Sequence, residues 1–309
     1  MFGIPHVGAD ICGFIGETTP ELCLRWYQVG SFYPFSRNHN SIGFKDQDPG
    51  SFGPKVAFNI RHALRLRYNL LPYLYTLFYN HRIYGSTVVR AMWNVFPRDL
   101  TCRGLDEQFM WGDGLLIAPV VAKGHTHKSV FFPGDGNRWY DFSYYLHTGT
   151  IAEVPKVFIG KRVKSLLLWK SCPSLFEEDS FFPYRQMPWT QPSPDTMTSP
   201  PRGRGKLFYD DGYSEGTLEA QEYYLARFIY DPQSSTLESQ VLMRGYPPMK
   251  NLKLSFVGIS GLEAKSIHYI VVNNSTVIGD YDYLNGRLAI RNLSLRMNEA
   301  FSITLHEGQ

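Results

Sequence analysis

The sequence predicts α/β structure followed by all-β structure, and three observations support this fold class. Short apolar runs at residues 4–7 and 32–35 lie on either side of a helical stretch, which is the strand–helix–strand order of a parallel sheet. A longer helical pattern covers residues 54–85. From residue 86 apolar and polar residues alternate, and Gly and Pro separate the runs, as in antiparallel strands.

The helix between the two apolar runs has well-marked ends. Thr19 is a suitable N-cap, Pro20 fits the first helical position, and Gly30 lies where a C′ glycine is expected. Asp10 and His39 each follow one of the two predicted buried strands. Because functional residues of a parallel (β/α) barrel gather at the carboxyl ends of its strands, we expect Asp10 and His39 to face the same opening.

The long helical pattern has one apolar face. Its members recur at steps of four and three residues: Leu64, Tyr68, Leu71, Tyr75 and Phe78. Pro72 is expected to kink or divide this helix, and Gly85 to end it. An aromatic stripe of this kind is far more often core than a ligand site, so we interpret it as part of the helical layer around the sheet.

The all-β part divides into many short runs. Strands are predicted within residues 87–96, 109–121 and 129–140, with a turn at residues 111–114. Further strands are predicted at 206–209, 223–230, 241–243, 252–257, 267–272 and 300–305. Asn285-Gly286 between two apolar runs is a strong hairpin signal.

The acidic residues that lie close together in the sequence do not form a convincing catalytic pair. Asp48 precedes a proline and is expected to cap a short helix, while Asp46 is a solvated loop charge. Asp210 and Asp211 are adjacent, so on a strand they would point to opposite faces. Asp113 suits a turn. No zinc-ligand spacing or phosphate-binding glycine loop is present, and we expect neither a metal nor a cofactor.

Composition excludes some classes of partner. The 309 residues are 43% hydrophobic and carry a net charge of +3 that is spread without a basic run, so nothing indicates nucleic acid. No apolar run approaches the roughly 18 residues needed to span a bilayer. We expect no signal peptide at Met1, which is followed at once by a predicted strand, and the sequence does not indicate a compartment or an oligomeric state.

Seven motifs resemble those of one known family. In chain order they are GADICGF, ELC…RW, FYPFSRNHN, KDQDP, LRYNLLPYLYTLF, QFMWGDGLLIAPV and GKLFYDDG. With them the chain resembles the C-terminal portion of the intestinal maltase-glucoamylase and sucrase-isomaltase α-glucosidases, members of glycoside hydrolase family 31 together with lysosomal α-glucosidase. The resemblance covers residues 1 to about 150 and resumes from about 205.

The resemblance implies a domain order. Residues 1–90 would be the C-terminal strands and helices of a (β/α)8 barrel, 91–180 a proximal β-sandwich, and 206–309 a distal β-sandwich. Because the resemblance fails from about residue 153, we expect the proximal sandwich to be disrupted. Residues 181–205 include a stretch rich in Pro, Ser and Thr, and we predict a disordered connector there.

The resemblance also implies substrate-binding residues. His39 matches a histidine that hydrogen-bonds the sugar, and Asp10 an aspartate that shapes the same pocket. Phe14 matches an aromatic wall of that pocket, and Arg37 an arginine beside it. The substrate would be an α-glucoside or malto-oligosaccharide. The alternative is structural: His39 would bond backbone groups, and Asp10 would organise loop amides.

Catalysis is a separate question from sugar binding. Retaining glycosidases need two carboxyl groups about 5–5.5 Å apart, one as nucleophile and one as acid/base. In the family both aspartates lie in motifs that this sequence does not contain, so we predict an α-glucosidase-like chain that does not by itself hydrolyse α-glucosidic bonds. The alternative functions are a non-catalytic carbohydrate-binding remnant and a structural or interaction module.

Four cysteines leave the redox state open. Cys12 and Cys23 match a pair that forms a disulfide in secreted family members, and the alternative is two buried thiols. Cys102 and Cys172 have no evident partner. Asn-x-Ser/Thr sequons begin at Asn273, Asn274 and Asn292, and they matter if the chain enters the secretory route.

Overall fold

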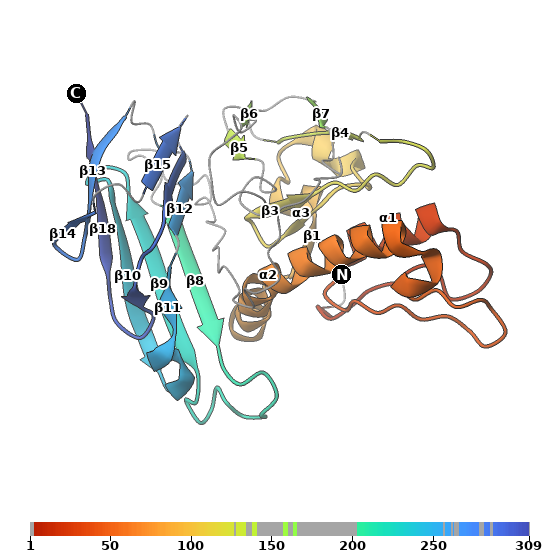
Figure 1. Ribbon diagram of the computed structural model, residues 1–309, viewed down its shortest axis with the longest axis horizontal. Helices are drawn as coiled ribbons and strands as arrows, with labels where there is room; N and C mark the ends of the chain where they lie inside the picture. Colours follow the sequence, from red (N-terminus) through yellow and green to blue (C-terminus); the bar gives the residue numbers. More distant parts are fainter. Residues whose placement is uncertain are drawn as a thin grey trace. The chain divides into compact units, whose positions relative to one another are not determined.

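The computed structural model describes residues 3–126, 128–133, 138–140, 157–159, 163–165, 203–255, 257–260, 262, 266–277, 281–284 and 287–308. The chain forms two compact units, which are described separately. The first contains Met1–Trp139 and Phe158–Pro183, and the second contains Tyr140–Val157 and Tyr184–Gln309. Figure 1 shows the helices in the amino-terminal part of the chain and the long antiparallel strands in the carboxyl-terminal part.

The first two predicted strands are present only as a parallel pair of extended segments. The Phe35 N–H donates to the Val7 carbonyl at 3.0 Å, and the Ile11 N–H donates to the Arg37 carbonyl at 2.9 Å. Ile11 and Asn38 form a parallel bridge. The predicted pairing is therefore confirmed, but regular strands are not, and the described residues contain no closed barrel.

The prediction that residues 4–7 form a buried strand is wrong. The side chains of Ile4 and Val7 are 69% and 50% exposed. Within a barrel each strand lies between two others, whereas this segment is hydrogen-bonded to one neighbour among the described residues. That neighbour approaches closely at Gly8, where an added Cβ would clash with the Phe35 carbonyl.

Helix α1, Pro20–Gly30, joins the two segments. Thr19 is its N-cap, with the side chain accepting from the Leu22 N–H at 3.2 Å, and Pro20 is its first residue, both as predicted. Gly30 is not a C′ residue but the last residue of the helix. Its small size matters for packing instead, because a Cβ there would come within 2.6 Å of Ile11 Cδ1.

Helix α2, Pro54–Tyr84, follows the short 3-10 helix η1, Pro49–Phe52, which Asp48 caps as predicted. The helix is not divided at Pro72, and it ends at Gly85 in the left-handed conformation. The predicted apolar face is not the buried one, since Tyr68 and Leu71 are 68% and 36% exposed. The helix instead buries a neighbouring stripe that includes Ile60, Ala63, Leu70, Tyr73, Leu74 and Leu77.

Two side chains of α2, Arg67 and Tyr73, hydrogen-bond the backbone of other segments. Arg67 donates to three backbone carbonyls after α1, those of Ser31 at 2.9 Å, Tyr33 at 2.5 Å and Pro34 at 3.1 Å. The Tyr73 hydroxyl donates to the Trp111 carbonyl at 2.9 Å. Because both side chains satisfy backbone groups of other elements, α2 fixes the path of the chain on both sides of it.

Short strands complete the first unit. A three-stranded antiparallel sheet has the order β1 (Val89–Ala91), β2 (Phe109–Trp111) and β3 (Leu115–Ile117), with the predicted turn between the last two. Strand β4 (Lys128–Val130) pairs with β7 (Val163–Ser165). Strand β5 (Arg138–Tyr140) pairs with β6 (Val157–Ile159), and the division between the units falls within both strands, since Tyr140 and Val157 count with the second unit. Residues 92–96, predicted as strand, begin with helix α3, Met92–Val95, and the 3-10 helix η2, Leu100–Gly104, follows it. Met92 is buried in one cluster with Cys102 and Met110.

The second unit is built from antiparallel sheets. The largest has six strands in the order β14 (Ser275–Val277), β13 (Ile267–Val272), β18 (Ser302–Glu307), β10 (Thr236–Arg244), β9 (Tyr224–Asp231) and β8 (Gly203–Tyr209). A second sheet has three strands in the order β12 (Val257–Ser260), β16 (Arg287–Ile290) and β15 (Tyr281–Leu284). A third sheet is the pair of β11 (Lys253–Leu254) and β17 (Leu295–Arg296). The 3-10 helix η3, Pro247–Asn251, precedes β11.

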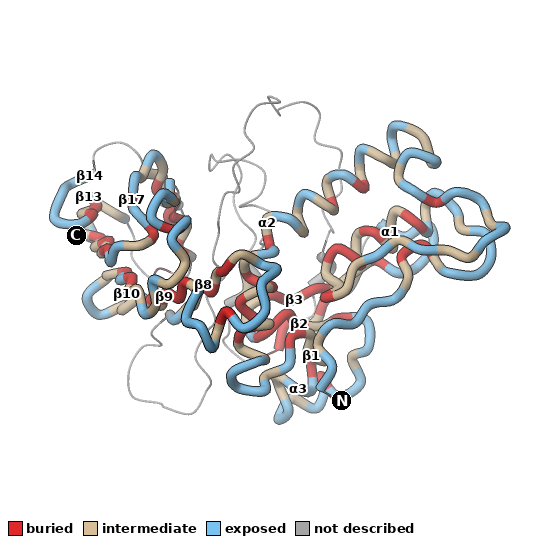
Figure 2. The backbone as a smooth tube through the Cα atoms, turned by 90° about the horizontal axis from the view of Figure 1, so that it is seen from below, coloured by how far each residue is buried: buried red, intermediate tan, exposed pale blue. Residues whose placement is uncertain are grey.

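The core of the second unit lies between these sheets. Ile259, Leu288 and Ile290 of the smaller sheet and Phe228 and Ile303 of the larger one belong to one buried cluster, and the buried stretches of β9 and β10 are marked in Figure 2. Leu284 pairs with Arg287, so β15 and β16 form the predicted hairpin. The Asn285-Gly286 turn itself and most of the predicted connector lie outside the described residues.

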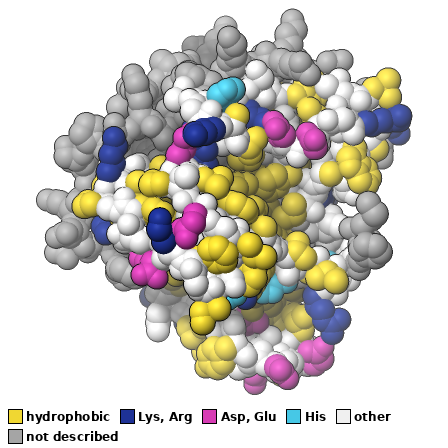
Figure 3. Space-filling view, turned by 90° about the vertical axis from the view of Figure 1, so that its right-hand side faces the viewer, with side chains coloured by type: hydrophobic (Ala, Val, Ile, Leu, Met, Phe, Trp, Pro, Cys, Tyr) yellow, Lys and Arg dark blue, Asp and Glu magenta, His cyan; other side chains and the backbone are white. Residues whose placement is uncertain are grey.

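Several large apolar side chains of the first unit are exposed. Besides those already named they include Phe14, Ile15, Ile42, Phe58, Ile83 and Tyr84. Figure 3 shows hydrophobic side chains gathered on one face of the molecule. None of the helices in the described part of the chain is both long and apolar enough to cross a membrane.

The buried thiol of Cys102 leads to a prediction about reactivity. Burial, together with the charge of Asp99, raises the pKa of Cys102 from 9.0 to about 11. Iodoacetamide reacts with the thiolate, so we expect the Cys102 peptide to stay unlabelled in the native protein at pH 8 and to be labelled in guanidinium. Peptide mass spectrometry separates Cys102 from Cys172. Complete labelling of Cys102 without denaturant would contradict the burial.

The same pKa shift makes the free energy of unfolding depend on pH. The folded chain holds the Cys102 proton more tightly than the unfolded chain does. The contribution of this thiol to the free energy of unfolding is therefore complete below pH 9.0 and is lost as the pH rises toward about 11. We expect a Cys102→Ala variant to lose less of its own stability than the native chain between these pH values, as measured by urea unfolding.

Candidate functional site

Asp10 and Arg37 form an ion pair at the ends of the two parallel segments. Arg37 Nη2 lies 2.7 Å and Arg37 Nε 3.2 Å from the same carboxylate oxygen, Asp10 Oδ1. The guanidinium also lies over the Phe35 ring, 5.2 Å from its centroid. The other oxygen, Asp10 Oδ2, has no hydrogen bond among the described residues. The two segment ends therefore lie close together, with Arg37 as the contact of Asp10, while a shared opening for Asp10 and His39 stays a prediction.

Phe14 and His39 form a second pair. Their ring centroids are 5.1 Å apart with an interplanar angle of 33°. Both side chains are exposed, Phe14 by 41%. The Ser41 N–H donates to the Phe14 carbonyl at 2.9 Å, which ties the loop after His39 to the loop after Asp10. No hydrogen bond to the His39 ring is present within the described ranges, so the alternative that His39 bonds backbone groups receives no support.

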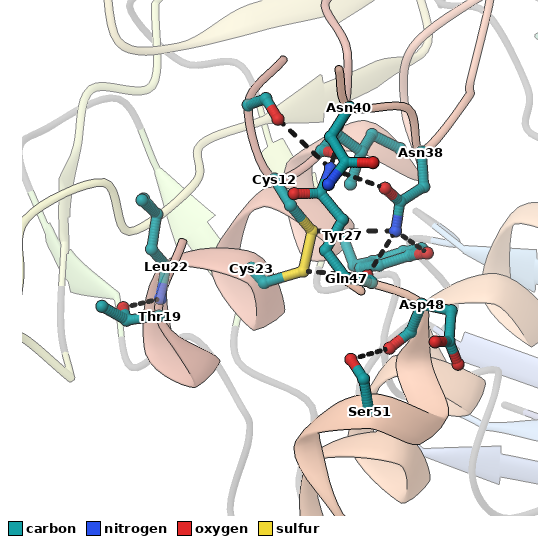
Figure 4. Close-up of a disulfide and its surroundings, with 12 residues drawn as sticks. Cys12, Thr19, Leu22, Cys23, Tyr27, Asn38, Asn40, Gln47, Asp48 and Ser51 are labelled. Carbon is teal, nitrogen blue, oxygen red and sulfur yellow. Dashed lines mark hydrogen bonds between the residues drawn. A yellow bond between two sulfur atoms is a disulfide. The ribbon is translucent and has the colours of Figure 1, made fainter. Parts of the chain in front are cut away.

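The buried side-chain amide of Gln47 connects the loop after Asp10 with the loop that carries Asn38 and His39. Gln47 is 4% exposed, and its Nε2 is within 3.2 Å of the Ile11 and Gly13 carbonyls and 2.9 Å from Asn38 Oδ1. Asn38 Nδ2 donates to the Gln47 carbonyl at 2.6 Å and to the Tyr27 hydroxyl at 2.8 Å. Figure 4 shows these side chains converging between α1 and the loops. The network fixes the positions from which Asp10 and His39 project.

The predicted disulfide is present beside this network. Cys12 bonds Cys23 of α1 across a sequence separation of 11 residues, as Figure 4 shows. Cys12 has a φ of 74°, which is unusual for a residue with a side chain, and the adjacent Gly13 has a φ of 94°. In the chain-entropy treatment a crosslink over a loop of this length stabilises the fold by about 3 kcal/mol, enough to hold a strained turn.

The remaining acidic candidates have structural roles. Asp210 is buried and accepts from Thr217 Oγ1 at 2.8 Å and from the Gly212 N–H at 2.9 Å. Asp211 accepts from the Ser214 N–H at 3.0 Å, and hydrogen bonds from Ser214 lower its pKa. Asp113 is ion-paired with Arg90. Across the described residues, no group of three or more His, Cys, Asp or Glu side chains is placed to hold a metal ion.

Sequence reasoning missed the supporting residues of the site. Gln47 and Asn38 lie in polar stretches of the sequence, so hydropathy gives no sign that Gln47 is buried. Tyr27 lies in a mostly apolar stretch of α1, which indicates packing and not a hydrogen bond to Asn38. Burial raises the pKa of the Tyr27 hydroxyl, which stays protonated at neutral pH while it accepts from Asn38. The usable signal in the sequence is the position of two of them in family motifs: Gln47 lies in KDQDP and Asn38 in FYPFSRNHN.

The network predicts a stability effect at Gln47. Replacing Gln47 by Leu keeps its approximate size but leaves the Ile11 and Gly13 carbonyls without this donor, so we expect a loss of about 1–3 kcal/mol. Asp46→Asn, at the exposed neighbouring position, is the control, with an expected change within about 0.5 kcal/mol. Tryptophan fluorescence in urea measures both, because five of the six tryptophans belong to the first unit. Equal stability of the two variants would refute the assignment.

Comparison with known proteins adds to this geometry. Residues 1–77 match the glycosyl hydrolases family 31 TIM-barrel domain, and residues 85–180 match the glycosyl hydrolase family 31 C-terminal domain. Probable maltase-glucoamylase 2 of Homo sapiens is 38% identical over 276 residues, which are 85% of this chain and 10% of that protein. Lysosomal alpha-glucosidase of Mus musculus is 34% identical over 98% of this chain and 33% of that protein.

The solved structures agree in fold. The glucosidase II alpha subunit, in a crystal structure with bound alpha3-Glc2, superposes with a TM-score of 0.70 at 23% identity and covers 97% of this chain and 34% of that one. This chain therefore spans between about a tenth and a third of the length of the relatives named here. The identity to probable maltase-glucoamylase 2 and to lysosomal alpha-glucosidase extends over most of the chain. The chain belongs to glycoside hydrolase family 31.

Proposed function

We propose that this chain contributes one wall of the glucose-binding subsite of an α-glucosidase and supplies no catalytic carboxylate. Asp10, Phe14, Arg37 and His39 would contact the sugar of an α-glucoside or malto-oligosaccharide. The observation that carries the proposal is the pairing of Asp10 with Arg37 and of Phe14 with His39 at the ends of two adjacent parallel segments, in a chain of this family.

The unused polar atoms of these residues suit a sugar. Asp10 Oδ2 and the His39 ring nitrogens are without hydrogen bonds among the described residues, and both side chains reach solvent. A sugar hydroxyl both donates and accepts, so it can bond a carboxylate oxygen and an imidazole nitrogen. The exposed Phe14 ring offers an apolar surface to the C–H face of the sugar. Arg37 would keep the Asp10 carboxylate oriented for this contact.

The same contacts argue against catalysis by Asp10. A retaining mechanism needs a nucleophile and an acid/base facing one anomeric carbon. Asp10 is held by a guanidinium, and Asp48, of the acidic pair in the sequence, is engaged by the Gly50 N–H at 2.8 Å as a helix cap. The family motifs that carry the two catalytic aspartates have no counterpart in this sequence. We therefore infer that hydrolysis requires carboxylates from another polypeptide segment.

A second candidate function is a non-catalytic structural or interaction module. Its support is the exposed apolar surface of the first unit, above all Ile4, Ile15 and Ile42, which are 69%, 79% and 99% exposed. Sugar binding by the isolated chain separates the two candidates. A glucose mimic such as 1-deoxynojirimycin should raise the melting temperature if the subsite forms, since a ligand that binds the folded state stabilises it.

The absence of catalysis is tested with a chromogenic α-glucoside. We expect no turnover by the chain alone, and turnover by a fusion in which the preceding barrel segments of an active relative are joined to it. Turnover by the unfused chain would overturn the proposal that the carboxylates come from elsewhere. An inactive but well-folded fusion would overturn the proposal that the subsite residues are competent.

The role of His39 is tested in the same fusion. We expect His39→Ala to lower kcat/KM by about 10- to 100-fold, which corresponds to the loss of one strong hydrogen bond to the substrate. His268→Ala is the matched control, because His268 is an exposed histidine of the second unit. Equal activities of the two variants would remove His39 from the subsite.

A further inference from the structure

Two of the three sequons overlap at one hairpin tip. Val272 pairs with Ser275, so Asn273 and Asn274 are the two central residues of the turn between β13 and β14. Their φ angles are 46° and 68°, which is the pattern of a type I′ turn and explains why asparagine is suited to both positions. All residues from Asn273 to Thr276 are exposed.

The two asparagines differ in what their side chains do. Asn273 Oδ1 accepts from the Ser302 N–H at 2.9 Å, and the Asn273 N–H donates to the Ser302 carbonyl at 3.1 Å. The first carboxamide is therefore held against β18. The Asn274 side chain makes no hydrogen bond within the described part of the chain and lies at the exposed end of the turn. A bulky substituent on Asn274 Nδ2 would disturb no observed contact.

The disulfide supplies an independent argument about environment. The Cys12–Cys23 bond is of a kind that forms and persists in oxidising compartments such as the lumen of the endoplasmic reticulum. The same lumen is where Asn-x-Ser/Thr sequons become glycosylated. A chain in which the bond is formed has thus met the conditions under which an exposed sequon is a substrate.

We propose that Asn274 carries an N-linked glycan. The Asn274 amide nitrogen would form a bond to C1 of an oligosaccharide activated as a lipid diphosphate. The C1–O bond to the diphosphate breaks, the lipid diphosphate leaves, and the amide gives up one proton. Two such glycans on consecutive residues would occupy the same volume, so modification of Asn274 excludes that of Asn273.

The position of the hairpin gives the glycan a physical consequence. Among the strands that the structure describes, β14 lies at an edge of the six-stranded sheet, and its Ser275 and Thr276 are exposed. An exposed edge strand can pair with a strand of another chain. A hydrated oligosaccharide attached at the residue just before β14 would obstruct that approach sterically.

The overlap of the sequons permits a sharp experiment. The full chain is secreted from cultured mammalian cells behind a cleavable signal peptide, and sites are mapped by mass spectrometry after release of the glycans by N-glycanase in heavy-oxygen water. Thr276→Ala removes only the sequon of Asn274. Ser275→Ala removes only the sequon of Asn273 and is the matched control one residue away. Asn292 is mapped separately in each sample.

We expect Asn274 to be modified in the native chain and in Ser275→Ala, and to be unmodified in Thr276→Ala. Non-reducing peptide mapping of the same samples confirms that the Cys12–Cys23 bond has formed. Modification of Asn273 in place of Asn274 in the native chain would overturn the proposal. An unmodified Asn274 in secreted, disulfide-bonded protein would overturn it equally.

Discussion

The side chain of Gln47 is the contact on which the candidate site depends. Two loops that are distant in sequence present Asp10 and Phe14 on one side and Arg37 and His39 on the other, and few backbone hydrogen bonds join them. The buried amide of Gln47 bridges both loops and is itself held through Asn38. Other links between the loops include the Ile11–Arg37 and Ser41–Phe14 backbone hydrogen bonds and the Asp10–Arg37 ion pair, whose side chains are more exposed than the buried Gln47 side chain.

The disulfide and α2 act on the same region from other sides. Cys12 is joined to α1, so the strained turn at residues 12–13 cannot separate from the helix that follows it. Arg67 of α2 binds three carbonyls of the chain between α1 and the second loop. Three different interactions therefore converge on two short segments. Their common effect is to hold in place Asp10 and His39, of which Asp10 Oδ2 and the ring nitrogens make no hydrogen bond among the described residues. Groups that are held in place beforehand lower the cost of ordering on ligand binding.

Much of the architecture could be predicted from local patterns. The caps at Thr19 and Asp48 and the stop at Gly85 were predicted correctly because each is a contact between neighbouring residues. Most strands of the second unit were predicted, because alternation follows directly from a half-buried sheet. Strands β14 and β17 were not predicted, and the single strand expected at 252–257 is wrong, since β11 ends at Leu254 and β12 begins at Val257. Predictions failed where the partner was distant. Gly30 packs against Ile11, and α2 buries a stripe one position away from the one that apolar content favoured.

The sequence by itself determined the family, the order of most elements and the disulfide partners, and it led to the proposal of four sugar-binding residues. Local periodicity, capping chemistry and short motifs are properties of neighbouring residues, so they can be read without a fold. Only the tertiary structure decided that Asp10 is paired with Arg37, that Phe14 meets His39, and that Gln47 joins the two loops. These contacts connect residues up to 36 positions apart. The path of the chain and the burial of its side chains decide which polar groups meet over such a distance, and neither can be read from neighbouring residues.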